Sequence, residues 1–392
     1  MRKLNILHMC STRRRGGSGA SASALVKKLF QRGHKVIYVC NETSLWYENL
    51  KDIGVTTVTS LGMKAKFRPT LKFFKGYWND IRKIKELIEK EKIDILHVHT
   101  SPEHWIGAIA SSLAKSPVPL IRTRHIVVPV RNNCINRYLF NRKTAKVIAV
   151  AETIRKNYFN NSSYDLSKIF TIHDGVDAEK FNPISNGRNV REEFKISSDT
   201  FLIGNIARFA RVKGHEYFFK AIYEVAKVFP NIKALLVGCG GVKSHAQEKE
   251  RIEKLVDECG VGKFVLFAGF RKDIPDVLAA IDLFVLSSIG SEGSSRGTIE
   301  AMAMAKPVVA SSVGVLPELV ANNVTGYIVP PKEPHAMADA IIKIIKEKEK
   351  AKAMGEKGRE IVLKEFTEDI MAEKTEKLYY DILNELMSNI KA

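Results

Sequence analysis

The sequence predicts two α/β domains, each built on a doubly wound parallel sheet. Its 392 residues exceed what one ordinary hydrophobic core holds, so two domains are the natural expectation. Short apolar runs alternate with amphipathic helical segments in two successive series, which is the pattern of strand–helix–strand units in a parallel sheet. The polar, weakly periodic stretch at residues 184–199 separates the two series, so we place the inter-domain linker near it.

Each series supplies its own strands. Five apolar runs predict strands in the first half, at residues 4–9, 35–40, 93–99, 118–123 and 145–150, with helical periodicity at 21–32 and 105–114. Five more predict strands in the second half, at residues 201–206, 232–237, 264–267, 283–286 and 307–310. We therefore expect a first domain over residues 1–180 and a second over 181–369, with a C-terminal helix at about 370–392 packing back on the first domain.

Composition indicates a globular protein of the cytoplasm. Hydrophobic residues make up 45% and charged residues 27% of the chain, as in soluble domains, and no run of about 18 apolar residues predicts a membrane-spanning helix. The charged start MRKLNILHMC lacks the long apolar region of a signal peptide. The five cysteines are odd in number and form no C-x-x-C pair, which argues against a structural zinc site or a disulfide framework.

The excess positive charge lies in the first half of the chain. Residues 1–168 hold 31 Lys and Arg against 11 Asp and Glu, whereas residues 169–392 hold 31 against 32. Such asymmetry concerns partners rather than fold. It predicts that an anionic partner meets the N-terminal domain: a membrane surface, a phosphorylated glycolipid or a nucleic acid. Nucleic acid is the least favoured, because no dedicated binding motif is present.

Two loops of the second domain carry chemistry suited to a phosphorylated ligand, which in open α/β sheets binds beyond the carboxyl ends of the strands. The Gly/Ser-rich loop at 290–297 leads into a helix, whose free N–H groups and positive dipole end suit a phosphate. Glu292 and Glu300 form an E-x7-E pair that suits sugar and ribose hydroxyls, although a solvated loop Glu and a helix-dipole Glu fit as well. Arg208 and Lys213 follow the strand at 201–206, where cations suit a pyrophosphate.

An ordered set of motifs covers nearly the whole chain. It comprises IHDGVDAEKFNP, IARFARVKGHEYFFKA, LLVGCGG, VLFAGFRKDIPDVLAAIDLFVLSS, SEGSSRGTIEAMAMAKPVVAS, VGVLPELV and TGYIVPP. The set resembles glycosyltransferase family 4 (glycosyl transferases group 1), a retaining class with the GT-B fold, in which two Rossmann-like domains face a cleft. The resemblance is strongest over residues 172–331 and implies transfer of a sugar from a nucleotide-sugar donor, UDP- or GDP-linked, without a cofactor.

The resemblance also implies roles for particular residues. Arg208 and Lys213 would contact the donor pyrophosphate, Glu300 the ribose and Glu292 the transferred sugar. The other donor-binding residues that it implies are Gly16, Gly17, Arg271, Gly293, Ser294, Ser295 and Arg296. The catalytic set that it implies is His99, Glu292, Arg208 and Lys213. The chain departs from the family pattern at Ser294-Ser295, Ala305 and Asp174, and none of these departures removes a charge needed for the pyrophosphate.

The acceptor is assigned to the N-terminal domain. Glycines at 16, 17 and 19 permit a tight turn after the first strand. Arg13, Arg14 and Arg15 precede this turn and suit an acidic acceptor, and a solvated basic loop fits them equally well. His104 and His125 are further acceptor candidates, whereas His97 is expected on the opposite face of its strand, packed in the core.

The segment at residues 64–90 suggests contact with a membrane surface. It interleaves five aromatic residues with seven Lys and Arg between Lys64 and Lys83, a combination that suits an anionic bilayer. An ordinary helix with buried aromatics and a basic solvent face has the same pattern. Together with the charge asymmetry, the segment favours a peripheral position at the inner face of the cytoplasmic membrane.

No D-x-D pair occurs in the chain, so no metal is expected to hold the diphosphate, and the two cations and the helix start would stabilise the leaving group instead. The predicted function is a retaining, metal-independent glycosyltransferase acting on a cell-envelope glycan or a lipid-linked acceptor. Two alternatives stay open: a nucleotide-sugar epimerase or phosphorylase of the same fold, and a non-catalytic protein that binds anionic lipid.

Overall fold

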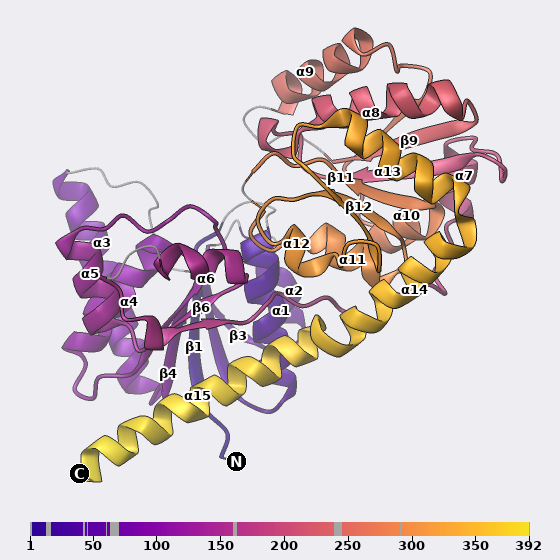
Figure 1. Ribbon diagram of the computed structural model, residues 1–392. Coiled ribbons are helices and arrows are strands. Elements are labelled where there is room, and N and C mark those ends of the chain that lie inside the picture. Colours follow the sequence, from indigo (N-terminus) through magenta and orange to yellow (C-terminus); the bar gives the residue numbers. More distant parts are fainter. Residues whose placement is uncertain are drawn as a thin grey trace. The chain divides into compact units, whose positions relative to one another are not determined.

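The computed structural model contains two compact units, each with its own parallel sheet (Figure 1). Unit 1 comprises Met1–Gly175 and Glu368–Ala392, and unit 2 comprises Val176–Thr367; the corresponding predicted boundaries were 180/181 and 369/370. The structure describes residues 2–12, 17–41, 44, 46–59, 61–62, 70–159, 163–238, 245–290 and 292–391.

Unit 1 holds a seven-stranded sheet in the order β3-β2-β1-β4-β5-β6-β7, in which every pair of neighbours is parallel. Its strands are β1 (Asn5–Cys10), β2 (Lys35–Cys40), β3 (Thr56–Val58), β4 (Ile95–Val98), β5 (Leu120–Arg124), β6 (Lys146–Ala149) and β7 (Ile169–Thr171). Its helices are α1 (Gly17–Gln31), α2 (Trp46–Asp52), α3 (Leu71–Lys90), α4 (Ser101–Leu113), α5 (Cys134–Tyr138), α6 (Glu152–Phe159) and α15 (Glu368–Lys391), with helical turns at Leu139–Lys143 and Leu166–Lys168.

Helices cover both faces of this sheet, as parallel strands require. Alternate strand residues point to opposite faces, so Leu7 packs in a core with α3 and α4, whereas Ile6 packs in a second core with α1 and α15. The C-terminal helix α15 is thus part of unit 1, where it contacts α1 (Figure 1).

Unit 2 holds a six-stranded parallel sheet in the order β10-β9-β8-β11-β12-β13. Its strands are β8 (Phe201–Ile206), β9 (Ile232–Val237), β10 (Val265–Gly269), β11 (Leu283–Leu286), β12 (Val308–Ser311) and β13 (Gly326–Val329). Its helices are α7 (Arg188–Glu193), α8 (His215–Val228), α9 (His245–Glu258), α10 (Ile274–Ala280), α11 (Arg296–Ala303), α12 (Leu316–Leu319), α13 (Pro334–Lys346) and α14 (Lys348–Glu365), with a helical turn at Arg211–Lys213. Helices α8, α9 and α13 share one core with the sheet, and α11 packs on β11, β12 and α14.

Both sheets have a topological switch point, the place where successive strands begin to be added on the other side of the first strand. In unit 1 it lies between β1 and β4, and in unit 2 between β8 and β11. Ligands of open α/β sheets bind at the carboxyl ends of the strands beside such a point. The fold therefore marks one candidate edge in each unit.

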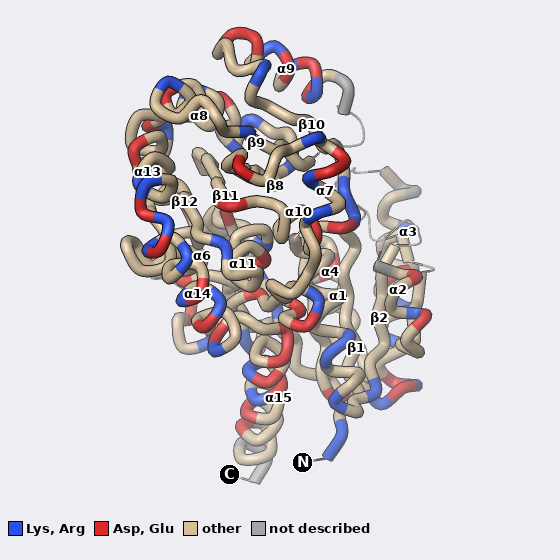
Figure 2. The backbone as a smooth tube through the Cα atoms, turned by 90° about the vertical axis from the view of Figure 1, so that its right-hand side faces the viewer, with Lys and Arg blue, Asp and Glu red and all other residues tan. Residues whose placement is uncertain are grey.

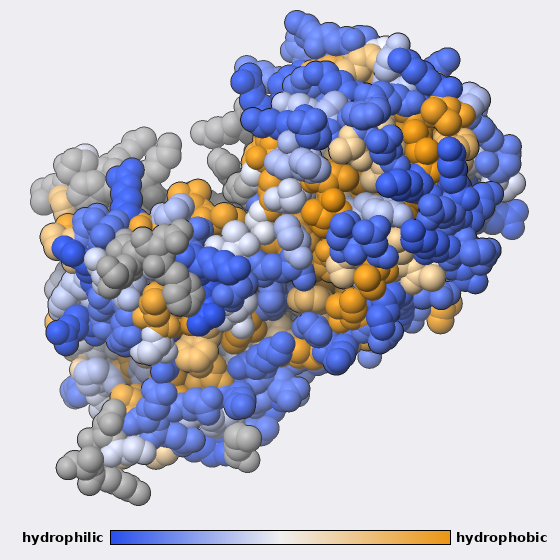
Figure 3. Space-filling model, viewed as in Figure 1, coloured by the Kyte–Doolittle hydropathy of each residue, from blue (hydrophilic) through white to orange (hydrophobic). Residues whose placement is uncertain are grey.

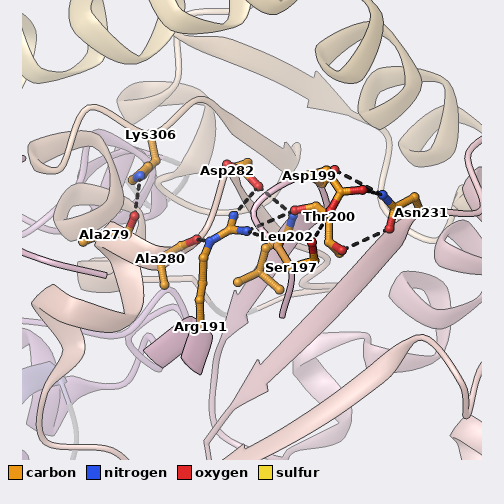
Figure 4. Close-up of polar contacts among 10 residues, drawn as sticks. All are labelled: Arg191, Ser197, Asp199, Thr200, Leu202, Asn231, Ala279, Ala280, Asp282 and Lys306. Atoms are coloured by element: carbon orange, nitrogen blue, oxygen red, sulfur yellow. Dashed lines mark hydrogen bonds and ion pairs between the residues drawn. The ribbon is translucent and has the colours of Figure 1, made fainter. Parts of the chain in front are cut away.

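The prediction of a linker near residues 184–199 is wrong, because this segment lies within unit 2 and contains α7. Arg191 of α7 attaches it to the sheet (Figure 4). The guanidinium pairs with the carboxylate of Asp282 at 2.7 Å, which also accepts from the Leu202 amide of β8 at 2.7 Å. The Arg191 guanidinium also donates to three backbone carbonyls, those of Ala280, Ser197 and Thr200. The polar composition that suggested a linker belongs to a network at the amino ends of β8 and β11.

The visible surface is mostly hydrophilic, with apolar patches between the charged side chains (Figure 3). Basic and acidic residues alternate along α9, α13, α14 and α15 (Figure 2). Among the described residues, no helix combines the length and the apolar character that a membrane crossing requires.

Candidate functional site

The switch point of unit 2 brings Lys213 and Glu292 into an ion pair. Lys213 lies in the turn after β8 and Glu292 in the loop after β11, and β8 and β11 are neighbours in the sheet. The Glu292 side chain is 4% exposed, and its carboxylate also accepts from the hydroxyl of Ser288. Two predicted site residues are therefore held together at the carboxyl edge of the sheet.

Two glycines let the backbone close around this pair. Gly214, next to Lys213, has a φ of 62°, and a Cβ there would lie 2.1 Å from the Ser287 carbonyl oxygen. Gly314, after β12, has a φ of 57°, and a Cβ there would lie 2.0 Å from the Glu292 carbonyl oxygen. The left-handed conformation and the close backbone approach both require glycine.

Helix α11 begins at Arg296, four residues after Glu292. Ser295, the residue before its first turn, has a left-handed backbone, and no side chain caps the helix. The Ser295 hydroxyl pairs instead with that of Thr298 at 3.0 Å. The positive end of the helix dipole thus lies beside the Lys213–Glu292 pair in the chain, where it favours an anion.

Glu300 lies one turn further along α11, near two cations. Arg296 Nε lies 3.7 Å from its carboxylate. Burial raises the pKa of Glu300 above its usual value, while the charges of Arg296 and Lys180 act in the opposite direction. A half-buried carboxylate of this kind suits hydrogen bonds from ligand hydroxyls.

The two remaining predicted cations differ in their surroundings. Arg208 is exposed and has no hydrogen-bond or ion-pair partner among the residues that the structure describes. Arg271, by contrast, pairs with Asp273 at 2.5 Å and with Glu193 at 2.6 Å. Arg208 is available to a diphosphate, whereas Arg271 is already neutralised by two carboxylates.

The carboxyl edge of unit 1 carries a continuous chain of buried or partly buried side chains joined by hydrogen bonds. Its order is Thr123–His97–Tyr379–His8–His99–His125, with contacts of 2.6, 2.6, 3.1, 3.2 and 3.1 Å. The rings of His97 and His99 stack with centroids 4.7 Å apart. His97 is packed as expected, but not on the opposite face: the two histidines are two residues apart, so their side chains point to the same side of β4.

Burial keeps these four imidazoles neutral at pH 7. It lowers the pKa of His8 to about 3 and that of His125 to about 4, and it holds the pKa values of His97 and His99 well below the usual range. A neutral imidazole has one donor and one acceptor nitrogen. The rings of His8, His99 and His125 are bonded directly to one another, so they must donate in the same direction and the tautomer of each fixes that of the next. The Tyr379 hydroxyl can donate or accept, so it links His97 to His8 without fixing this direction.

Three of these histidines also meet the distance requirement for a shared metal ion. Ring nitrogens of His8, His97 and His99 lie within 4.8 Å of one another. Both nitrogens of each ring already take part in the hydrogen-bond chain, so a metal would have to displace these bonds.

The other N-terminal candidates are placed as follows. His104 is buried, and its Nε2 lies 2.8 Å from the Thr144 hydroxyl. Within the part of the chain that the structure describes, the buried His125 Nδ1 has no hydrogen-bond partner, and the charge of Asp174 favours protonation of this ring. Gly17 begins α1, and Gly293 and Ser294 lie in the loop before α11. Arg13, Arg14, Arg15 and Gly16 lie outside the described residues.

Sequence reasoning missed several residues of this edge. His8 and Tyr379 are 371 positions apart, so no local motif joins them. Arg122 and Arg124 were detectable, because two arginines at alternate positions of an apolar strand point to one buried face.

The comparisons with known proteins assign both units. Residues 15–180 match the model of Glycosyltransferase Family 4, and residues 187–361 match that of Glycosyl transferases group 1. A relative, N-acetyl-α-D-glucosaminyl L-malate synthase of Bacillus anthracis, is 28% identical over 94% of this chain and 95% of its own length.

Solved structures show the same fold. A glycosyltransferase from Rickettsia africae aligns with a TM-score of 0.87 and 23% identity, covering 98% of this chain and 99% of its own. Alr3699/HepE of Anabaena, solved in complex with UDP and glucose, aligns with a TM-score of 0.82 and 22% identity, covering 96% and 99%. Two parallel-sheet units with the residues above at their carboxyl edges, and family matches over both, identify the chain as a member of glycosyltransferase family 4, the glycosyl transferases group 1, with the GT-B fold.

Proposed function

We propose that this glycosyltransferase is a retaining, metal-independent enzyme that moves a sugar from a UDP- or GDP-linked donor to an anionic acceptor of the cell envelope, a glycan or a lipid-linked saccharide. The observation that supports it best is the cluster at the switch point of unit 2. There the Lys213–Glu292 pair is followed in the chain by the uncapped start of α11.

In this proposal the donor binds to unit 2. Lys213, the exposed Arg208 and the N–H groups of α11 bind the diphosphate, for which a fork of donors and a helix start are both suited. Glu300 accepts from the ribose hydroxyls and Glu292 from the transferred sugar. The backbone of residues 293–296 binds the sugar and the adjoining phosphate. Arg271 contacts the base only after exchanging one of its present carboxylate partners.

The proposed transfer needs no covalent enzyme intermediate. The bond between the anomeric carbon and the donor phosphate breaks, and the acceptor hydroxyl attacks the same face, so configuration is retained. The hydroxyl proton passes to the departing phosphate oxygen. Lys213, Arg208 and the helix dipole stabilise the charge that develops on the diphosphate, a role that takes the place of a metal ion.

The acceptor is assigned to unit 1, with His99 beside the transferred sugar and His104, His125 and the arginines at 13–15 around the acceptor. The name of the Bacillus anthracis relative couples an N-acetylglucosaminyl group to L-malate, a dicarboxylate, which supports an anionic acceptor. The positive charge of residues 1–168 supports the same proposal and a peripheral position at the inner membrane face.

Donor hydrolysis and transfer by point variants test the assignment. Arg208→Ala and Glu300→Gln should each lower kcat/KM by about 100-fold or more with an unchanged melting temperature. The control is Arg211→Ala, an exposed arginine in the same turn, which should keep full activity. EDTA should not reduce turnover, and NMR of the product should show the anomeric configuration of the donor.

Three results would contradict the proposal. They are near-normal turnover in both site variants, restoration of activity by a divalent cation after chelation, and an inverted product. A donor panel scored by thermal shift identifies the base, because a bound nucleotide raises the melting temperature of the folded state that it binds.

A further inference from the structure

Strand β5 buries two arginines on one face of the unit 1 sheet. Arg122 and Arg124 are 4% and 7% exposed. Thr123 lies between them and points to the opposite face of the sheet, where its hydroxyl bonds His97. The two arginines share the face of Leu120, which packs in the core with α3 and α4. Buried arginines are rare in proteins unless they are paired.

Most of the buried guanidinium nitrogens have no partner. Within the described part of the chain, Arg122 Nε, Arg122 Nη1 and Arg124 Nε are buried and make no hydrogen bond. Arg124 Nη2 donates to the Val128 carbonyl at 2.5 Å, and its guanidinium lies over the Tyr158 ring at 5.8 Å. Neither contact supplies negative charge, and a buried cation without an anion is costly.

The carboxylate whose charge acts on Arg122 is bonded to backbone amides. The charge of Glu103 favours the protonated form of Arg122, but its carboxylate accepts from the backbone amides of His99 and Thr100, at 3.1 and 2.7 Å, and from that of Ser11. Burial lowers the pKa of Arg122 to about 10, so this guanidinium remains charged at pH 7. Glu103 thus uses its carboxylate oxygens for backbone amides, while β5 buries two guanidinium groups on this face.

The two arginines line a pocket with a volume of about 210 Å³. Its other walls come from the first turn of α4, with His104 and Trp105, and from the segment after β5, with Ile126 and Val128. Ile126 and Val128 are 52% and 60% exposed, which gives the pocket an apolar rim above a cationic floor. The pocket therefore lies at the carboxyl edge of the sheet, where ligands of such sheets bind.

We propose that this pocket binds an oxoanion group, a phosphate or a carboxylate, through the guanidinium groups of Arg122 and Arg124. Each guanidinium presents parallel N–H donors that match two oxygens of such a group. The anion supplies hydrogen-bond acceptors for guanidinium nitrogens that have none among the described residues, and its charge offsets theirs. His104, already bonded to Thr144, shapes the wall rather than adding charge.

The bound group belongs to the sugar acceptor, and this part of the inference rests on the proposed function. The pocket then selects acceptors by charge. A neutral analogue would leave two buried cations unpaired, and sites of this kind discriminate strongly against ligands that lack the matching polar group. Binding of a free anion does not depend on the transfer reaction and is tested separately.

The experiment titrates the full chain with inorganic phosphate and with malonate, at constant ionic strength set by NaCl, and follows heat and melting temperature. Wild type should bind at least one of the two anions. Arg122→Met and Arg124→Met should each weaken that binding by at least about 30-fold and leave UDP-dependent stabilisation unchanged. The control is Arg82→Met on α3, an arginine whose side chain is 65% exposed.

The two variants also separate binding from folding. Removal of an unpaired buried charge should leave the melting temperature of the free protein unchanged or raise it, so a loss of phosphate binding in a well-folded variant supports the site. The absence of phosphate and malonate binding in wild type, or equal binding in both β5 variants and the control, would overturn the proposal. If the protein binds the anion through these arginines but transfers no sugar, the anion site is supported and its assignment to a sugar acceptor is refuted.

Discussion

Gly214 connects Lys213, which pairs with Glu292, to the first turn of α8, and a Cβ placed on it would lie 2.1 Å from the Ser287 carbonyl oxygen. Gly260 after α9 has nearly the same conformation, with a φ of 65°, but no atom lies within 4 Å of a Cβ placed there. The two glycines share the left-handed backbone conformation, and they differ in how close other atoms would lie to an added Cβ.

Gly214→Ala is therefore expected to destabilise the protein by clearly more than Gly260→Ala. The second change should cost about 1 kcal/mol from the left-handed conformation alone. The first adds a clash with the Ser287 carbonyl, displaces Lys213 and should also abolish nucleotide binding. Urea unfolding and UDP titration of both variants check this, and equal losses of stability would show that the close contact is relaxed in solution.

His215, at the start of α8, is 2% exposed, and neither of its ring nitrogens has a partner in the described structure. Burial lowers its pKa to about 3, with the charges of Arg251 and Lys213 acting in the same direction. The folded-state pKa thus lies below the unfolded value of about 6.5. Below pH 6.5 the unfolded chain takes up a proton that the folded chain does not, so stability falls as the pH decreases towards 3.

Because of His215, the free energy of unfolding should fall by about 2 kcal/mol as the pH decreases from 6.5 to 5. His215→Leu should remove that contribution, whereas His335→Leu should not, because His335 is exposed and Glu224 raises its pKa. Urea unfolding at pH 7.5 and pH 5 measures the difference. An unchanged pH dependence in His215→Leu would mean that the ring is hydrated in the folded protein.

At the scale of elements, α15 contributes to the carboxyl edge of unit 1 through one hydroxyl. Tyr379 is fully buried, and its oxygen lies 2.6 Å from His97 Nδ1 and 3.1 Å from His8 Nε2. The next residue, Tyr380, donates to the Arg2 carbonyl at 2.8 Å in an exposed position. Tyr379 and Tyr380 thus allow the loss of a buried hydroxyl and of an exposed hydroxyl to be compared on the same helix.

Tyr379→Phe should destabilise the protein by about 1–3 kcal/mol, because two buried histidine nitrogens lose their partner, while Tyr380→Phe should stay within about 0.5 kcal/mol. The tautomers of His99 and His125 should change as well, since the chain of hydrogen bonds is cut. Thermal unfolding and ¹⁵N NMR of the imidazoles report both effects. Unaltered tautomers in Tyr379→Phe would show that His99 and His125 are oriented by other contacts.

The elements themselves were largely predictable. The strands at 35–40, 201–206, 232–237 and 283–286 have the predicted bounds, because buried parallel strands are short apolar runs bounded by polar turns. The three strands that sequence reasoning missed are β3, β7 and β13, which all lie at sheet edges and have only three or four residues. Such segments are too short for a period of two to be visible, and their neighbours in the sheet define them.

At the scale of the whole molecule, the basic first half of the chain and helix α3 favour contact with an anionic surface. The aromatic residues of α3 divide between two faces. Tyr77 packs against the core and stacks on the buried Phe73, whereas Phe74 and Trp78 are 51% and 58% exposed. Both interpretations of this sequence therefore apply in part: one face of the helix packs against the core, and the other presents aromatic side chains to solvent.

The wild-type protein should sediment with vesicles that contain anionic lipid and not with neutral vesicles, and salt should weaken this binding because the Debye length at 0.1 M is only about 10 Å. Phe74→Ala combined with Trp78→Ala should reduce the bound fraction several-fold. Tyr223→Ala, which removes an aromatic ring 45% exposed on α8, is the control. Equal sedimentation of the double variant and the control would exclude α3 as the contact surface.

The sequence by itself determined the two-domain parallel-sheet fold, the family and the loops that bring Lys213 and Glu292 to one edge of the unit 2 sheet. Apolar periodicity and loop motifs are local, and a helix start or a glycine turn has the same physical meaning wherever it occurs. The tertiary structure decided what depends on partners distant in the chain. Tyr379 of the last helix joins His8 and His97 of the first sheet, and Arg271 is neutralised by two carboxylates. Among the described residues, three buried nitrogens of Arg122 and Arg124 have no hydrogen-bond partner. A charged side chain is stabilised or left unpaired by its neighbours in space, and these neighbours are brought together only when the sheet is assembled.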